Sequence, residues 1–320
     1  MVFQTFPQIL PYSLIIGQET LKRALELAYI APNLGGVLLS GHRGTGKSTA
    51  VRAFSLMMYD RLPVTLPINV TEDRVVGGWD VDELMRGNSE WQPGLLKKAD
   101  GSMLYIDEVN LLDDHIVNII LDVTSTGVLE VQRETKESQP ESCTFTLIGT
   151  MNPEEGHLRP QLIDRFGLMV QISTEEDKRT ELLETILKYD KARFLQQQGQ
   201  TVIWLEEAYQ KNQARQKILK AAKNKLYEVK LPLSIKKSCI ALAKEFKVEG
   251  HRSEYIIALA AQANAALEGV TEVTTEHIKQ VAALSLQHRR PEFVQRGRMN
   301  WSEKNTKKVK QLIEKIRVNG

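Results

Sequence analysis

Short apolar runs recur through the first half of the chain, and segments with helical periodicity lie between most of them. Apolar runs at residues 35–40, 64–70, 102–107, 145–150 and 168–173 are predicted to form β-strands. Residues 18–31 carry apolar side chains at helical spacing and are followed by Pro32, so a helix is predicted to end there. Strands that alternate with helices form a parallel sheet covered on both faces. We therefore predict an α/β domain over residues 1–175.

The pattern becomes helical after this region. Residues 176–290 are predicted to form a smaller α-helical domain, which Pro232 and Gly250 interrupt. The basic segment 291–320 carries apolar side chains on one helical stripe, which predicts a short amphipathic helix. The stripe consists of Val309, Leu312, Ile313 and Ile316. This helix could dock on its own domain or on a partner protein.

Composition narrows the class of protein. The chain has 320 residues, 42% of them hydrophobic and 26% charged, which is ordinary for a water-soluble globular protein. Its 42 Lys and Arg against 40 Asp and Glu leave a net charge of +2, so no basic field points to nucleic acid. Cys143 and Cys239 match no zinc or redox spacing and are expected to be buried thiols. Without an apolar run long enough to span a bilayer or a secretory signal, we expect a cytoplasmic protein.

A glycine-rich segment that fits G-x-x-x-x-G-K-[ST] follows the first predicted strand and precedes a helical pattern. The segment consists of Gly41, His42, Arg43, Gly44, Thr45, Gly46, Lys47, Ser48 and Thr49. In this context the backbone N–H groups turn inward around phosphate oxygens, and the helix N-terminus adds the positive end of its dipole. Lys47 would reach the β- and γ-phosphates, and the Ser48 hydroxyl would bind Mg²⁺. The sequence therefore predicts binding of a nucleoside triphosphate.

Polar residues stand at the ends of two later apolar runs, and Arg165 follows soon after the second of them. Asp107 could bind Mg²⁺ through water, and Glu108 could orient and deprotonate an attacking water, because ligands gather at the carboxyl ends of parallel strands. Asn152 could fix that water or touch the γ-phosphate, or it could only cap a turn. Arg165 could neutralise phosphate charge on a neighbouring subunit; local sequence alone favours a surface salt bridge. Together with the phosphate-binding loop, these residues predict triphosphate hydrolysis.

These residues resemble those of an AAA+ ATPase, and specifically of the magnesium chelatase ATPase subunit I family. The resemblance is dense from about residue 6 to 175 and thinner to about 290. Besides the phosphate-binding loop, the matching segments are 6–7, 16–18, 35–38, 71–78, 92–96, 104–115, 131–134, 152–156, 165–167, 231–233, 250–252 and 288–289. The resemblance implies a P-loop domain with a parallel five-stranded sheet, followed by an α-helical lid domain.

The resemblance also implies roles for single residues. Residues 41–48 are similar to the Walker A loop, and Asp107 with Glu108 to the Walker B pair. Asn152 occupies the position of the sensor-1 residue. Arg165 resembles the arginine finger, which acts on the nucleotide of a neighbouring subunit.

The resemblance implies further roles for the lid, the N-terminal segment and two insertions. Arg252 resembles the sensor-2 arginine that the lid supplies. The adenine pocket would be lined by Ile16, Gly17 and Gln18. Residues of about 70–100 resemble the family's insertion in helix 2, and residues of about 127–146 its hairpin before sensor 1. The first insertion carries Trp79 and Trp91, which could contact a partner or pack under a loop.

By this resemblance the chain is expected to be the motor of a magnesium chelatase-like complex. Hydrolysis of Mg–ATP would drive insertion of Mg²⁺ into protoporphyrin IX by a separate catalytic subunit. The expected partners are copies of itself in a hexameric ring, an integrin-domain AAA+ subunit and a large chelatase subunit. The short segment 57–63 and the basic ending after Arg290 depart from the family. They leave open a MoxR-type or cobaltochelatase-like ATPase that remodels a different protein.

A non-hydrolysing scaffold subunit is a further alternative. The residues expected to take part in hydrolysis argue against it, because all of them are present. They are Lys47, Asp107, Glu108, Asn152 and Arg165.

Overall fold

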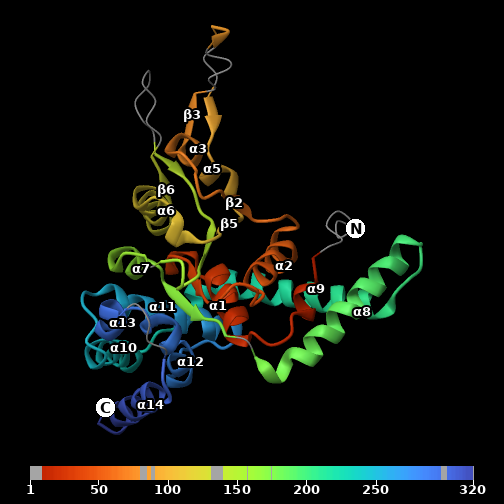
Figure 1. The fold of residues 1–320 in the computed structure, drawn as a ribbon. Helices are drawn as coiled ribbons and strands as arrows, with labels where there is room; N and C mark the ends of the chain where they lie inside the picture. Colours follow the sequence, from red (N-terminus) through yellow and green to blue (C-terminus); the bar gives the residue numbers. More distant parts are fainter. Residues whose placement is uncertain are drawn as a thin grey trace.

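A computed structural model describes residues 9–79, 85–87, 91–130, 140–156, 158–173, 175–296 and 301–319. Its centre is a five-stranded sheet in the order β2-β5-β8-β1-β9, and every neighbouring pair is parallel. The strands are β1 (Val37–Ser40), β2 (Val64–Leu66), β5 (Met103–Ile106), β8 (Thr146–Met151) and β9 (Leu168–Gln171). The predicted α/β architecture is confirmed (Figure 1).

The second predicted strand is shorter than expected. The apolar pattern predicts residues 64–70, but β2 ends at Leu66. Pro67 follows, and its missing N–H group and fixed φ end a strand readily. The other four strands agree with the prediction to within two residues at either end.

Helices cover both faces of the sheet because alternate strand residues point to opposite sides. On one face, Val37 and Leu39 pack in the same apolar cluster as α1 (Glu19–Ile30) and α2 (Lys47–Tyr59). On the other face, Leu38 joins a cluster with α5 (Leu95–Ala99), α6 (Asp114–Thr126) and α7 (Pro160–Arg165). The fully buried β1 and β5 are therefore interior strands of the sheet.

The second half of the chain is helical, as predicted. Its helices are α8 (Arg179–Gln197), α9 (Ile203–Lys225), α10 (Leu233–Glu245), α11 (Arg252–Leu267), α12 (Thr275–Leu286), α13 (Pro291–Arg296) and α14 (Glu303–Asn319). Pro232 caps α10, and Gly250 has a φ of +74° shortly before α11, so both interruptions fall between helices. The helix α9 packs against α1 and α2 as well as against α11.

The predicted amphipathic helix at the end of the chain is α14, and it docks on its own domain. It packs against α10 and α12, with Val309 and Ile313 buried. Trp301, just before it, stacks on Phe246 at a centroid distance of 5.1 Å. Docking on the chain itself is thus the alternative that the structure supports.

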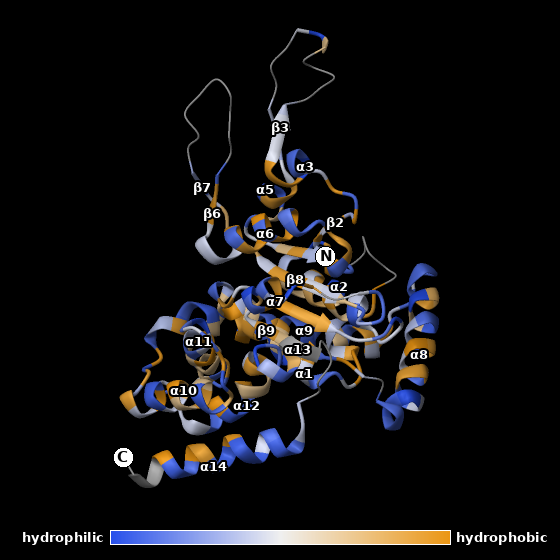
Figure 2. Cartoon of the chain, turned by 60° about the vertical axis from the view of Figure 1, so that its left-hand side comes forward, coloured by the Kyte–Doolittle hydropathy of each residue, from blue (hydrophilic) through white to orange (hydrophobic). Residues whose placement is uncertain are grey.

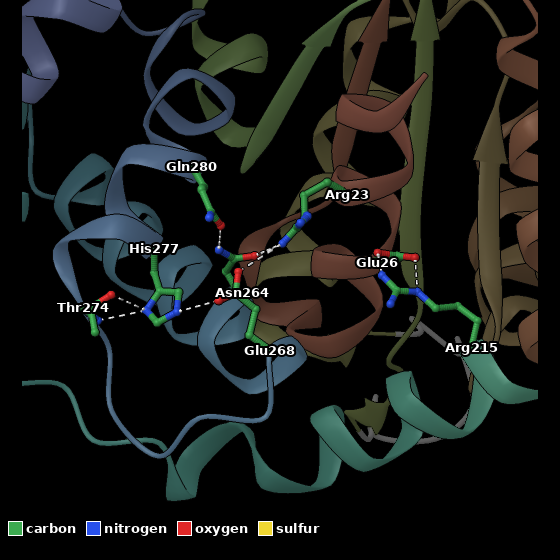
Figure 3. A network of polar contacts seen from close by, with 8 residues as sticks. All are labelled: Arg23, Glu26, Arg215, Asn264, Glu268, Thr274, His277 and Gln280. Carbon is green, nitrogen blue, oxygen red and sulfur yellow. Dashed lines mark hydrogen bonds and ion pairs between the residues drawn. The ribbon is translucent and has the colours of Figure 1, made fainter. Parts of the chain in front are cut away.

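Polar side chains connect α1 to the lid helices (Figure 3). The guanidinium of Arg23 donates to Asn264 Oδ1 on α11, and the Asn264 amide donates to Gln280 on α12. The buried carboxylate of Glu26 receives two hydrogen bonds from Arg215 on α9, at 2.7 and 2.5 Å. A buried carboxylate needs such a paired cation. The five-stranded sheet and the helices of the second half are therefore joined through α1.

Two short two-stranded arms extend from the side of the molecule opposite the lid (Figure 1). One pairs β3 (Gly77–Trp79) with β4 (Trp91–Pro93), between α3 (Glu72–Val76) and α5; the other pairs β6 (Val128–Leu129) with β7 (Glu141–Ser142). Trp79 and Trp91 pack edge to face across the first arm, 5.6 Å apart. The arms fall within the predicted insertions at about 70–100 and 127–146, of which residues 80–84, 88–90 and 131–139 lie outside the described residues.

The helix α8 carries apolar side chains on its exposed surface (Figure 2). Leu183, Leu187 and Phe194 are about 60% exposed (58%, 60% and 58%), whereas Tyr189 and Ala192 are buried. Within the described part of the chain, none of the helices is both long enough and apolar enough to cross a membrane.

Candidate functional site

The phosphate-binding loop connects β1 to α2, as the motif requires. Gly44 and Gly46 have φ values of +78° and +81°, a region that glycine adopts readily. A Cβ atom on either would meet nothing within 4 Å, so the loop faces open space. A Cβ atom on Gly41 would lie 2.5 Å from the Ile172 carbonyl oxygen, so only glycine fits there.

A hollow of about 490 Å³ lies in front of this loop. It brings together predicted site residues from the loop and from the ends of β5 and β8. Its lining residues are Arg43, Gly44, Thr45, Gly46, Lys47, Ser48, Thr49, Asp107, Glu108, Thr150, Met151 and Asn152.

The register of the sheet explains this convergence. Ile106 pairs with Gly149, so the residues that follow, Asp107 and Thr150, lie side by side. β8 also pairs with β1, and the Gly41 N–H donates to the Met151 carbonyl at 3.1 Å. The loop and the two strand ends thus share one edge of the sheet.

A continuous chain of hydrogen bonds connects the loop to the acidic pair. The Ser48 hydroxyl lies 2.9 Å from the hydroxyl of Tyr105, which donates to Asp107 Oδ1 at 2.9 Å. The Thr150 hydroxyl donates to the same oxygen at 2.7 Å and accepts the Glu108 N–H at 3.0 Å. Burial and the nearby Asp107 carboxylate raise the pKa of Tyr105 to about 12, which keeps it a hydrogen-bond donor.

The side chain of Lys47 folds back over its own loop. Its Nζ donates to the carbonyl oxygens of Gly41 and His42, both at 2.7 Å. Burial lowers the pKa of Lys47, and the carboxylates of Asp107 and Glu108 act in the opposite direction. Because Nζ lies beside the hollow, a phosphate group could take over one of these hydrogen bonds.

Glu108 is paired with the phosphate-binding loop. Arg43 Nη2 lies 3.1 Å from Glu108 Oε1 and 2.6 Å from Glu155 Oε1. Glu108 also has a φ of +56°, which is unusual for a residue other than glycine. The strained backbone turns at the strand end and brings the carboxylate to the edge of the hollow.

Asn152 lines the hollow and is buried. Its Oδ1 accepts the Glu154 N–H at 3.3 Å, so it caps the turn that follows β8. Capping a turn and lining a phosphate site are compatible, since the Nδ2 group remains a donor.

The segment predicted to line the adenine pocket lies away from this hollow. The N–H group of Gln18 donates to Glu175 Oε1 at 2.8 Å at the start of α1, and Gly17 packs closely on the same carboxylate. Thr20, two residues later, lines a second hollow of about 540 Å³ that shares Gly41 and His42 with the loop. Ile16, Gly17 and Gln18 are not among the described residues that line this second hollow.

Arg165 forms a surface ion pair, as local sequence alone suggested. Its Nη1 lies 2.5 Å from Asp122 Oδ1 on α6, and the side chain is 37% exposed. Arg252, at the start of α11, donates to the Arg165 carbonyl at 2.7 Å. Among the described residues that line the hollow at the phosphate-binding loop, neither arginine is present.

Side chains at the end of the lid helix α12 form hydrogen bonds with the backbone on either side of Arg165. The buried guanidinium of Arg289 donates to the carbonyl oxygens of Asp164, Phe166 and Gly167, and pairs with the Asp164 carboxylate at 3.0 Å. His288 Nε2 lies 3.0 Å from the Phe166 carbonyl. Burial lowers the pKa of Arg289 to about 10 and that of His288 well below its usual value.

Comparison with known proteins adds to this geometry. A model of the AAA domain (dynein-related subfamily) matches residues 36–166, and a model of the AAA lid domain matches residues 236–312. The magnesium-chelatase 38 kDa subunit of Chlorobaculum parvum is 38% identical over 322 residues, which cover 87% of this chain and 90% of that protein. The chain belongs to the magnesium-chelatase 38 kDa subunit family.

The chain is also similar to a protein without a chelatase name and to a more distant protein of known structure. An uncharacterized protein of Mycobacterium tuberculosis is 39% identical over 291 residues, which cover 88% of this chain but 44% of that protein. A putative ATPase of Cytophaga hutchinsonii of known structure has a TM-score of 0.61 and 16% identity, over 96% of this chain and 91% of that one. The latter similarity shows the fold alone.

The site of this family member contains functional groups that sequence reasoning missed. Tyr105 and Thr150 carry the hydrogen bonds to Asp107, and Arg289 holds the Arg165 segment. The spacing of Tyr105 and Asp107 was a usable signal, because strand residues two apart share a face. For Arg289 the resemblance marked residues 288–289 without giving a role, since the carbonyl oxygens that it binds near Arg165 lie over 120 residues away.

The donor atoms present suit Mg²⁺. The Ser48 hydroxyl and the Asp107 carboxylate offer oxygen atoms joined by one hydrogen-bond chain, and Mg²⁺ prefers oxygen. Nowhere in the described part of the chain do three or more His, Cys, Asp or Glu side chains cluster as a metal site. Two protein oxygens beside a phosphate cradle match a metal that arrives with the nucleotide.

Proposed function

We propose that the chain is an ATP-hydrolysing motor subunit of a magnesium chelatase-like complex. The observation that carries the proposal is the hydrogen-bond chain from Ser48 through Asp107 to Glu108 beside the phosphate-binding loop. Membership of the magnesium-chelatase family supports the complex in which this chemistry would be used.

Four of the side chains that line the hollow would act in hydrolysis. Lys47 would release its loop carbonyls and bind the β- and γ-phosphates, while Ser48 and Asp107 would hold Mg²⁺. Bound there, Mg²⁺ neutralises the charge of the phosphate oxygens. Glu108 would accept a proton from the water that attacks the γ-phosphorus, which yields ADP and phosphate. For this step Glu108 must leave the 3.1 Å contact with Arg43.

The remaining cation would come from a neighbouring copy. Arg165 is about one-third exposed and belongs to a helix on the opposite face of the sheet from α2, so the phosphate site of its own chain is not its natural target. On a neighbour it would exchange Asp122 for the γ-phosphate. Arg252 and Arg289 would act as positioning residues that set the Arg165 segment, since both bind its backbone.

The assembly proposed is a homo-oligomeric ring, with a hexamer as the expected size. Its partners would be an integrin-domain AAA+ subunit and a large chelatase subunit, which inserts Mg²⁺ into protoporphyrin IX while this chain hydrolyses ATP. Support comes from the relatives of this chain, which are themselves subunits of magnesium chelatase.

Glu108→Gln tests the chemistry. The variant keeps the size of the side chain and removes its basicity, so turnover should fall at least about 10²-fold while nucleotide still binds. Phosphate release and binding of a fluorescent ATP analogue would be measured side by side. Glu184→Gln, an exposed acid on α8, is the control and should hydrolyse ATP normally. Unchanged turnover in Glu108→Gln would remove this residue from the mechanism.

A second candidate is a MoxR-type or cobaltochelatase-like ATPase that remodels another protein. The Mycobacterium tuberculosis relative is the reason to retain this candidate. It is 39% identical to this chain, as similar as the chelatase subunits, and carries no chelatase name. The candidates separate in a reconstitution with the other two subunits of a magnesium chelatase. A chelatase motor should support ATP-dependent formation of Mg-protoporphyrin, detected by its fluorescence, whereas a motor with another client should hydrolyse ATP without forming it.

A further inference from the structure

Tyr105 is a buried aromatic residue whose hydroxyl reaches the nucleotide site. Its relative exposure is 1%, and its ring belongs to the apolar cluster that contains α1 and α2. Its hydroxyl lies between Ser48 Oγ and Asp107 Oδ1, 2.9 Å from each. These are the two side chains that the proposed function assigns to Mg²⁺.

We propose that Tyr105 is a positioning residue for the magnesium site, which orients the Ser48 hydroxyl and the Asp107 carboxylate toward the metal. The inference rests on the proposed function, since it concerns the same site. It adds a group that does not itself touch the nucleotide or the metal.

The directions of the hydrogen bonds carry the inference. A carboxylate only accepts, so the single Tyr105 proton goes to Asp107 Oδ1. Tyr105 must then accept in its contact with Ser48, so the Ser48 proton points away from the hollow. The lone pairs of Ser48 Oγ are left for a cation. Without this acceptor, the Ser48 proton could rotate into the position of the metal.

The carboxylate is oriented in the same way. Asp107 Oδ1 accepts from both Tyr105 and Thr150, at 2.9 and 2.7 Å. Among the hydrogen bonds of the described residues, none involves Oδ2. One oxygen is therefore fixed by protein donors, and the other is available to water of the metal's hydration shell. Partners of this kind that do not touch the metal typically alter metal affinity about 10- to 100-fold.

The chain offers a matched control in Tyr59. Its hydroxyl lies 2.9 Å from Thr146 Oγ1, and burial raises its pKa to about 12, as for Tyr105. Both tyrosines therefore bond a side-chain hydroxyl of the same domain. Tyr59 makes no contact with Ser48 or Asp107 among the described hydrogen bonds, so its replacement by Phe reports the general effect of losing such a group.

The experiment measures Mg²⁺-dependent nucleotide binding rather than turnover. Binding of N-methylanthraniloyl-ATP would be followed by fluorescence across a Mg²⁺ titration in wild type, Tyr105→Phe and Tyr59→Phe. In Tyr105→Phe the Mg²⁺ concentration at half-maximal effect should rise roughly tenfold, while affinity without Mg²⁺ stays the same. Tyr59→Phe should match the wild type in both measurements.

A double variant extends the test to the Ser48 contact. If Tyr105 acts largely through Ser48, the effect of Tyr105→Phe should shrink in a Ser48→Ala background, because residues that act as a unit are not additive. Melting temperatures of all variants identify any loss of folding. A full tenfold effect in the Ser48→Ala background would remove the link to Ser48.

Three results would overturn the proposal. They are an unchanged Mg²⁺ midpoint, a lower midpoint (the hydroxyl would then block the metal), and an equal loss of affinity with and without Mg²⁺. The proposed function fails separately: a wild-type protein that binds Mg²⁺-nucleotide but never releases phosphate would refute hydrolysis, while the titration would still decide the role of Tyr105.

Discussion

The hydroxyl of Thr150 serves two acidic residues with different tasks. It donates to the carboxylate of Asp107 and accepts the backbone N–H of Glu108. Thr150 is 1% exposed, so water cannot easily replace either bond. A side chain of the same shape without the hydroxyl would leave both groups without this partner. One hydroxyl therefore aligns the proposed metal ligand with the proposed base.

Thr150→Val tests this alignment. Loss of a hydrogen bond to a charged group costs about 1.5–3 kcal/mol, so kcat for ATP hydrolysis should fall about 10- to 100-fold. Steady-state phosphate release measures the effect. Thr150→Ser keeps the hydroxyl and should retain most of the activity. Thr146 lies on the same strand as Thr150, and its hydroxyl is bonded to Tyr59. Thr146→Val removes that hydroxyl, controls for lost stability and should hydrolyse ATP normally. Normal turnover in Thr150→Val would disprove the alignment.

At the scale of elements, the end of α7 and the short connection to β9 depend on the lid for their position. Arg252, His288 and Arg289 all bind main-chain carbonyls of residues 164–167. Backbone carbonyls that accept hydrogen bonds from guanidinium groups are held more firmly than solvated ones. Any shift of α11 or α12 relative to the sheet would therefore move Arg165 as well.

The helix α14 is a second element that the lid depends on. Ile313 is 2% exposed and lies in the cluster shared with α10 and α12. Ile313→Ala should lower the free energy of unfolding by about 2–5 kcal/mol, as for other large-to-small changes in a core. Urea unfolding followed by circular dichroism measures this. Glu314→Ala, on the exposed side of the same helix, should change it by less than about 0.5 kcal/mol. Equal midpoints for the two variants would show that α14 does not contribute to the lid.

The sequence predicted these elements and this site to different depths, for physical reasons. The phosphate-binding loop is local, so its motif located Lys47 and Ser48 directly. The strand that ends before Asp107 was recognisable from its apolar run, but the partnership of Tyr105 with Ser48 spans 57 residues and depends on tertiary packing. Pro67 shortened β2 against its apolar pattern. Roles assigned to Asn152, Arg165 and Arg252 stay predictions, since they concern a bound nucleotide.

For the whole molecule, the phosphate cradle and the proposed finger lie in different places. The cradle begins α2, which packs in the cluster with α1, whereas α7 and Arg165 belong to the opposite face of the sheet. Figure 1 shows α7 to the left and α2 to the right of α1. A chain that offers a cradle on one side and a cation on another suits a head-to-tail ring, in which every interface combines the two.

Mixing two inactive variants tests the shared site. Arg165→Ala should reduce turnover roughly 10³-fold, because a finger arginine is worth about 10³–10⁵ in kcat. Lys47→Ala should also be inactive, since the cradle loses its cation. In a mixed oligomer, an interface formed by the intact cradle of one variant and the intact Arg165 of the other has all its parts. Phosphate release should therefore reappear on mixing and peak near equal amounts.

The control mixes either single variant with Lys47→Ala/Arg165→Ala protein. This mixture cannot form a complete interface, so it should show no recovery of phosphate release. If the two single variants assemble together, as gel filtration of tagged and untagged chains would reveal, yet remain inactive, Arg165 does not act across the interface.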